Sequence, residues 1–192
     1  MKALVPGLLA GALAIAVSGP TAEAQESLRM AVSPALSPQD AGEAFERAVI
    51  DICIASISQG RRVADMPPAR SMLSETDDPL RRQQASAGSD ETVWDVSAAR
   101  GVVTVKEKAG RCAVSVYGPP AAPTAILLAA KLTDDGFERV ASASTGGIRQ
   151  SLQRIDGERQ VQVMVTGSDP GSPGHNSRFS VVTATVFDMK AR

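Results

Sequence analysis

Aromatic residues and histidine are scarce in this chain. Its 192 residues include four Phe, one Trp (Trp94), one Tyr (Tyr117) and one His (His175). So few rings leave little from which to build a base-stacking surface or an aromatic shelf for sugars. A single histidine also falls short of the two or more that many zinc sites and hydrolytic centres use. We therefore expect no metal and no cofactor.

The chain also lacks an excess of charge of either sign. Lys and Arg number 20 and Asp and Glu number 21, which gives a formal net charge of -1. Nucleic-acid binding requires a basic field that this balance does not provide, so we expect no nucleic-acid partner. Disorder of the whole chain is excluded too, because an apolar fraction of 43% accompanies the low net charge.

Long apolar runs are missing, apart from one run at the N-terminus that is too short for a membrane helix. Residues 3–17 follow a short positive start and span about 15 residues, where a bilayer-spanning helix needs roughly 20. Residues 18–20 (Ser-Gly-Pro) end the run, and Ala22 and Ala24 are small residues at the two positions that a signal peptidase reads. We predict a signal peptide over residues 1–24, cleaved after Ala24. The mature chain would then be periplasmic or secreted, without stable membrane insertion.

Only two cysteines are present, Cys53 and Cys112. In an oxidising compartment, a lone pair of thiols is typical of a disulfide. The bridge would close a loop of about 60 residues and stabilise the fold by roughly 4 kcal/mol. Two alternatives remain open: a redox pair, which usually has Cys-x-x-Cys spacing, and a metal site, for which two cysteines and one histidine are one ligand short.

Two helices are predicted in the mature chain. After a flexible arm over residues 25–37, a single domain covers residues 38–192. Ser37 is placed to cap a helix that runs from residue 38 to about 59, with Gly60 closing it. A second helix is expected over residues 123–135, where apolar residues recur at spacings of three and four.

Residues 61–91 lack this periodicity and contain five arginines and three prolines. We predict a long surface loop there. Loops of this length are either functional or disordered, so the segment is a candidate interaction site. Its near-balanced charge favours a solvated loop over an interaction site.

Alternating apolar and polar residues predict strands from residue 91 onward. Three strands precede the second helix and four follow it: 93–97, 101–106, 111–117, 137–144, 148–155, 159–167 and 178–187. The fold class is therefore α+β. We expect an antiparallel sheet of six to seven strands with two helices packed on one face and the disulfide joining the first helix to the third strand.

Three arginines form a candidate anion-binding site. The pair Asp156-Gly157 is a two-residue hairpin signal, and the register that this turn sets places Arg154 directly opposite Arg159. Arg139 would lie nearby on the preceding strand. Arginine presents a planar, bidentate fork, so the group would bind a phosphate, a carboxylate or an acidic polysaccharide. The alternative is that these side chains extend into water beside neighbouring acids.

Several structural motifs occur together in the exported chain. A helix carries Phe45 and Cys53, Trp94 opens the first strand, and Gly110-Arg111-Cys112 precedes Tyr117-Gly118-Pro119. In this combination the chain resembles small periplasmic proteins of alphaproteobacteria. The resemblance implies a disulfide between a helix and a strand, and it carries no activity over to this chain.

The sequence favours a non-catalytic periplasmic protein that interacts with another periplasmic protein or an envelope component. A second hypothesis is a carrier of a small apolar ligand, with a pocket between the helices and the sheet. A third is a hydrolase with carboxylates or His175 converging in a cleft. Asp169, His175 and Asn176 share one loop and are candidates for such a site.

Overall fold

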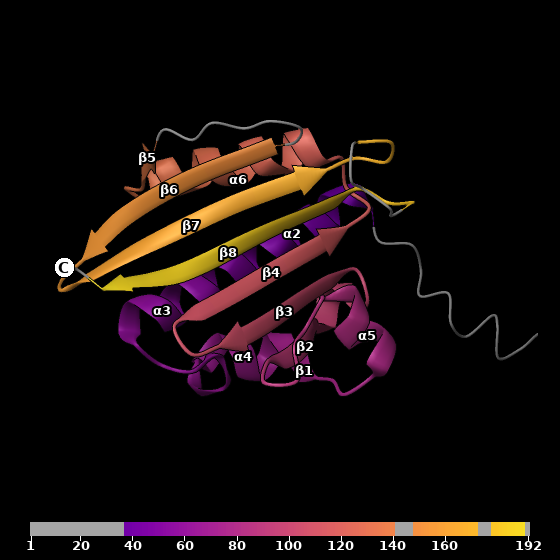
Figure 1. The fold of residues 1–192 in the computed structure, drawn as a ribbon, viewed down its shortest axis with the longest axis horizontal. Helices are drawn as coiled ribbons and strands as arrows, with labels where there is room; N and C mark the ends of the chain where they lie inside the picture. The colour runs from indigo at the N-terminus through magenta and orange to yellow at the C-terminus, as the bar shows by residue number, and fades with distance from the viewer. Residues whose placement is uncertain (1–36, 141–147, 173–177, 191–192) are drawn as a thin grey trace, which may run out of the picture. The chain divides into compact units, whose positions relative to one another are not determined.

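The computed structural model of the chain describes residues 37–140, 148–172 and 178–190. The predicted signal peptide and all but the last residue of the predicted arm lie outside the described residues. The described residues form an α+β fold in which eight strands make one antiparallel sheet, in the order β1-β2-β3-β4-β8-β7-β6-β5 (Figure 1). The predicted fold class is confirmed, with one strand more than expected.

The strands are Leu73–Glu75 (β1), Thr92–Val96 (β2), Val103–Lys108 (β3), Arg111–Tyr117 (β4), Glu138–Val140 (β5), Ile148–Asp156 (β6), Arg159–Ser168 (β7) and Val181–Lys190 (β8). The α-helices are Pro38–Arg47 (α2), Ala55–Gln59 (α3), Pro67–Met72 (α4), Pro79–Gln84 (α5) and Ala121–Asp134 (α6). A π-helical segment, Ala48–Ile54 (η1), joins α2 to α3, and two short 3₁₀ turns are Val63–Asp65 (η2) and Ser97–Ala99 (η3). Within the described ranges, no helix is long and apolar enough to cross a membrane.

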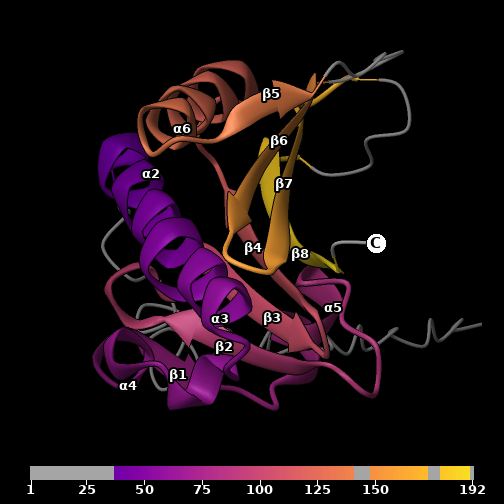
Figure 2. The same ribbon diagram turned by 90° about the vertical axis from the view of Figure 1, so that its left-hand side faces the viewer.

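The sheet has two halves, and the strands of each half follow a long helix in the sequence. In each half a long helix is followed by antiparallel strands, α2-η1-α3 by β2 to β4 and α6 by β5 to β8. The halves meet where β4 pairs with β8, with Val114 opposite Ala184. Both long helices lie on the same face of the sheet, as predicted (Figure 2).

The first helix begins and ends at the predicted residues. The side chain of Ser37 accepts a hydrogen bond from the backbone N–H of Asp40 at 3.1 Å, and Gly60 ends α3 with φ +62°. The π-helical turn between them was not expected. It accompanies the burial of three consecutive residues, 52–54, against the sheet, more than one stripe of a regular α-helix presents.

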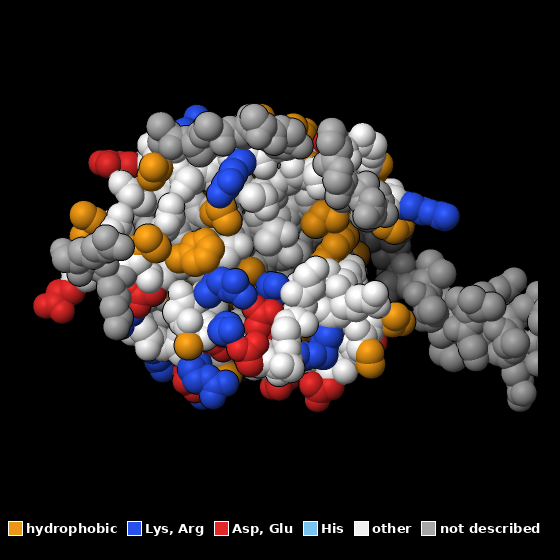
Figure 3. Space-filling view, in the orientation of Figure 1, with side chains coloured by type: hydrophobic (Ala, Val, Ile, Leu, Met, Phe, Trp, Pro, Cys, Tyr) orange, Lys and Arg blue, Asp and Glu red, His pale blue; other side chains and the backbone are white. Residues whose placement is uncertain are grey.

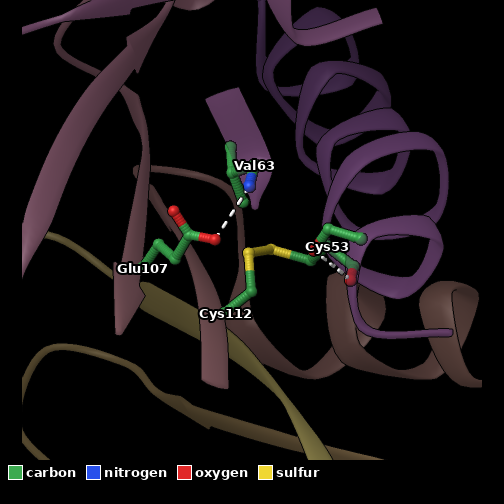
Figure 4. The surroundings of a disulfide bond; sticks show 5 residues. Cys53, Val63, Glu107 and Cys112 are labelled. Carbon is green, nitrogen blue, oxygen red and sulfur yellow. Dashed lines mark hydrogen bonds between the residues drawn. A yellow bond between two sulfur atoms is a disulfide. The ribbon is translucent and has the colours of Figure 1, made fainter. Parts of the chain in front are cut away.

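The predicted disulfide is present between Cys53 of η1 and Cys112 of β4 (Figure 4). Both cysteines are fully buried, and their Cα atoms are 5.3 Å apart. Val114 and Val116 share the face of Cys112 and are also fully buried. The bridge therefore ties the first helix to the inner face of the sheet, and it is compatible with an extracytoplasmic location.

The segment over residues 61–91 is more structured than the predicted loop. It contains η2, α4, the edge strand β1 and α5. Val63 is fully buried, and Met66 and Ala69 are almost so, although they are too few to show a period in the sequence. Asp78 caps α5, because its carboxylate accepts the N–H of Leu80 at 2.9 Å.

Candidate functional site

The space between the helices and the sheet is filled by the core. Phe45, Val49 and Ile52 of the first helix and Leu128 and Leu132 of α6 have no accessible surface. Water therefore does not reach these side chains. The stripes that would line the pocket of an apolar-ligand carrier are therefore packing surfaces, and a functional surface must be sought outside the core.

The predicted opposition of Arg154 and Arg159 is wrong. In the structure Asp156 pairs with Arg159, and Arg154 lies opposite Val161. The turn residues are Gly157 and Glu158, one residue later than expected. Gly157 has φ +63° and no residue beside it has a positive φ, so the turn is of the Gly-x kind, which needs positive φ only at its first central residue.

Arg154 is committed to structural contacts. Its guanidinium donates two hydrogen bonds to the Asp156 carboxylate, at 2.7 and 2.8 Å, and one to the backbone carbonyl of Asp135 at 2.9 Å. The same group lies over the ring of Phe137. The Arg154 guanidinium and a hydrogen bond from Ser58 lower the pKa of Asp156, although burial opposes this. These contacts join the β6–β7 hairpin to the ends of α3 and α6.

Arg159 and Arg139 occupy different surroundings. Arg159 donates to the Asp188 carboxylate at 2.5 Å, and its guanidinium lies against Gly60 at the end of α3. Arg139 is exposed on β5, opposite Leu152. In the described part of the chain, no contact joins Arg139 to the other two arginines. The three candidate residues therefore do not form one site.

The sheet face that turns away from α2 and α6 is the strongest candidate functional surface. We call the outward side chains of β6, β7 and β8 the open face: Arg149, Ser151, Gln153, Ile155, Gln160, Gln162, Met164, Thr166, Ser168, Val181, Thr183, Thr185, Phe187 and Met189. Arg149 is the only charged residue of the open face, and it lies on β6, the strand of the three that is farthest from β4. Figure 3 shows this region mainly in white and orange, with charged side chains gathered towards β3 and β4.

Uncharged polar side chains bind one another across the open face. The Gln160 amide donates to the Gln153 side chain at 2.9 Å, and the Gln162 amide donates to the Ser151 hydroxyl at 2.8 Å. A turn at residues 156–157 would place these pairs directly opposite. With the turn one residue later they are diagonal neighbours, and because each partner moves by two residues, the same side chains stay on the outer face.

A row of hydroxyl groups extends the open face towards β3. Thr104, Ser115, Thr183 and Thr166 lie opposite one another on β3, β4, β8 and β7. The Ser115 and Thr183 hydroxyls are 2.9 Å apart. Ser115, Thr183 and Thr166 of this row line the floor of a hollow of about 710 Å³, which is also lined by Tyr117, Phe179 and residues of the α5 end.

The segment after α5 forms one wall of the hollow. The Tyr117 hydroxyl donates to the Gln84 carbonyl at 2.5 Å, and the Lys106 ammonium donates to the Ser86 carbonyl at 3.0 Å. Burial raises the pKa of the Tyr117 hydroxyl, partly opposed by hydrogen bonds with Ser115 and Thr104. Ser86 has φ +49°, which an L residue adopts only when its surroundings hold it there.

The buried carboxylate of Glu91 also holds the segment after α5 in place. Glu91 accepts the Gly88 N–H at 2.8 Å and pairs with Arg111 and Lys106. Burial disfavours its charge, but the Gly88 N–H, Arg111 and Lys106 outweigh burial and hold the pKa of Glu91 below its ordinary value. The Glu91 carboxylate therefore ties Arg111 and Lys106 to the segment that forms the wall of the hollow.

The loop that carries the hydrolase candidates is described only in part. The Asp169 carboxylate accepts the Ala121 N–H at 2.9 Å and the Ser180 hydroxyl at 2.6 Å, which places it at the start of α6. His175 and Asn176 lie outside the described residues. In residues 37–140, 148–172 and 178–190, no group of three His, Cys, Asp or Glu side chains is arranged to hold a metal.

Comparison of the chain with protein-family models, with curated proteins and with solved structures finds no match. The function must therefore be argued from the surfaces of the chain itself.

Sequence reasoning missed how far the uncharged surface extends. Thr183, Thr185 and Phe187 alternate with the buried residues Val182, Ala184 and Val186, and that alternation was visible in the sequence. What it could not show is that β8 lies between β4 and β7. This placement turns three separate polar strand faces into one surface.

Proposed function

We propose that the protein is a non-catalytic, exported interaction protein whose open face binds another protein. The observation that carries the proposal is the uncharged centre of that face, on three adjacent strands. Depletion of charge, with aromatic and Met side chains among neutral polar groups, is the composition of protein–protein interface cores. The partner surface is uncharged as well, because a charge placed there would lose its hydration without gaining a counter-charge.

The hollow beside Tyr117 and Phe179 supports the same proposal. Binding energy at interfaces is concentrated in a few side chains that enter pockets, surrounded by contacts that exclude water. The hydroxyl floor formed by Ser115 and Thr183 would hydrogen-bond a polar group at the tip of such an anchor. Export is supported by the signal-like N-terminus, the buried disulfide and the resemblance to periplasmic proteins.

Site-specific photo-cross-linking in the producing cells tests this proposal. The full-length chain carries a benzoyl-phenylalanine at Gln162 on the open face or, as the control, at the exposed Ile126 on α6. We expect a discrete, protease-sensitive adduct from Gln162 and none from Ile126. Adding Thr183→Glu should reduce the adduct by about tenfold or more, because it buries an unpaired charge at the centre of the interface.

Three outcomes would overturn the proposal. Equal adducts from both positions would show non-specific contact, and no adduct from either would remove the interaction. An adduct that resists protease and carries glycan would assign the open face to an envelope polysaccharide instead. Circular dichroism and thermal melts of each purified variant, compared with Gln39→Glu on the α2 face, separate loss of binding from loss of folding.

A further inference from the structure

A second hollow, separate from the open face, has a strongly cationic lining. Its volume is about 290 Å³, and it lies where the end of α3 meets the β3–β4 turn and the paired ends of β7 and β8. Its charged lining residues are Arg61, Arg62, Lys108, Arg159, Glu107 and Asp188. Four cations therefore face two acids.

Each acid accepts a hydrogen bond through one oxygen, while Oδ1 of Asp188 is buried without a hydrogen-bond partner among the described residues. Glu107 accepts the Val63 N–H at 2.8 Å, as Figure 4 shows, and Asp188 accepts the hydrogen bond from Arg159. Lys108 pairs with Asp90 outside the hollow, at 2.6 Å. The two cations that remain are the neighbours Arg61 and Arg62.

Arg61 and Arg62 have little internal compensation. Among the described residues, Arg61 donates a side-chain hydrogen bond only to the backbone carbonyl of Asp65, at 3.3 Å. The side chain of Arg62 makes no hydrogen bond or ion pair with another described residue. Both side chains are exposed.

The backbone on either side of this pair is held in place. Before it, the Arg61 N–H bonds to the Ser56 carbonyl at 2.9 Å in the turn that Gly60 closes, one turn beyond the disulfide at Cys53. After it, the Glu107 carboxylate holds the N–H of the fully buried Val63. The backbone that carries the two arginines is thus held in place, which removes part of the entropy cost of ordering them around a ligand.

We propose that this hollow binds a phosphate monoester, with Arg61 and Arg62 in direct contact and Arg159 at the rear. Guanidinium groups bind phosphate oxygens bidentately, and a phosphate has enough oxygens for more than one arginine. The volume is near the lower end of ligand pockets, which suits one small ester or a lipid headgroup. This proposal does not depend on the protein-binding role of the open face.

Calorimetric titration of the mature protein with glycerol phosphate tests the site. We compare wild type with R61Q/R62Q and with R47Q/R70Q, a control that removes the same charge from α2 and α4. We expect saturable binding to wild type and to the control, and affinity lower by at least about tenfold in R61Q/R62Q, because charge-assisted hydrogen bonds are lost. Unchanged melting temperatures would show that all three chains are folded.

A vesicle arm distinguishes the source of the phosphate. Retention on vesicles of phosphatidic acid and phosphatidylcholine, but not of phosphatidylcholine alone, would place the monoester on a lipid if R61Q/R62Q abolishes it. Binding of glycerol phosphate without vesicle retention would place it on a soluble ester. The proposal is overturned if wild type binds neither probe, or if both double variants lose affinity equally, since the effect would then reflect net charge alone.

Discussion

The guanidinium of Arg154 lies 4.5 Å from the centre of the Phe137 ring, so the end of α6 and the β6–β7 hairpin share one cation–π contact. Its two hydrogen bonds to Asp156 fix the orientation of the guanidinium plane. The side chain is 28% exposed, so water only partly screens these interactions.

We expect Arg154→Ala to lower the free energy of unfolding by roughly 1–3 kcal/mol, because it removes the ring contact and leaves Asp156 without its cation. Arg154→Lys should recover only part of this, since lysine has no bidentate fork. Urea denaturation measures both variants. The exposed Arg139→Ala is the control and should change the value by less than about 0.5 kcal/mol. Equal losses at the two positions would contradict a structural role for Arg154.

Two glycines of the first helix should respond to alanine in opposite directions. Gly60 has φ +62°, and an added Cβ would collide with the Arg159 guanidinium, so Gly60→Ala should destabilise the protein by about 1–2 kcal/mol. Gly42 lies within α2 with open space around it, so Gly42→Ala should stabilise by up to about 1 kcal/mol. Thermal melts of both variants test this. A change in melting temperature in the same direction for both would refute the predicted contrast.

Acid should weaken the fold partly through Glu91. Its pKa is lower in the folded protein than its ordinary value of 4.5, so its contribution to stability is present above that pH and is lost as the pH falls through the folded pKa. Glu91→Gln should therefore be less stable than wild type at pH 7, with the difference shrinking towards pH 3. Urea unfolding at several pH values measures this. Glu75→Gln, at an exposed position, should have the same free energy of unfolding as wild type at every pH. A loss of stability in Glu91→Gln that does not change with pH would argue against the ionic contribution.

Tyr117 is the one tyrosine of the sequence, so the titration of its hydroxyl can be followed directly and reports on the wall of the hollow. Burial raises the pKa of Tyr117 above 10.0, so its ultraviolet transition to tyrosinate should have a midpoint above that pH in the folded protein. In denaturant the midpoint should return to about 10, the value of a free tyrosine. The stability that the buried phenol contributes is present below that pH and is lost as the pH rises through the folded pKa. Identical midpoints in both states would contradict a closed wall over Tyr117.

Local patterns predicted those elements whose burial follows a regular period. The bounds of β4 match the prediction residue for residue, because Cys112, Val114 and Val116 alternate with residues of the outer face. The first helix was equally clear, since Ser37 and Gly60 mark its two ends.

Other features depend on tertiary contacts that have no local period. β1 has three residues and is a strand because it pairs with β2. The β6–β7 turn lies one residue later than predicted, and this moved Arg154 away from Arg159. The cationic hollow joins Arg61 to Arg159 across the sequence, and only the packed fold brings these two residues together.

The central position of β8 sets the order in which the sheet can form. β8 follows every other strand in the sequence, but it lies between β4 and β7, and Tyr117 of β4 pairs with Val181. The two halves of the sheet cannot join until the ribosome has made residues 181–190, so β8 closes the sheet after all of its other described strands have been synthesised. Until then β4 and β7 each have one edge without a partner strand.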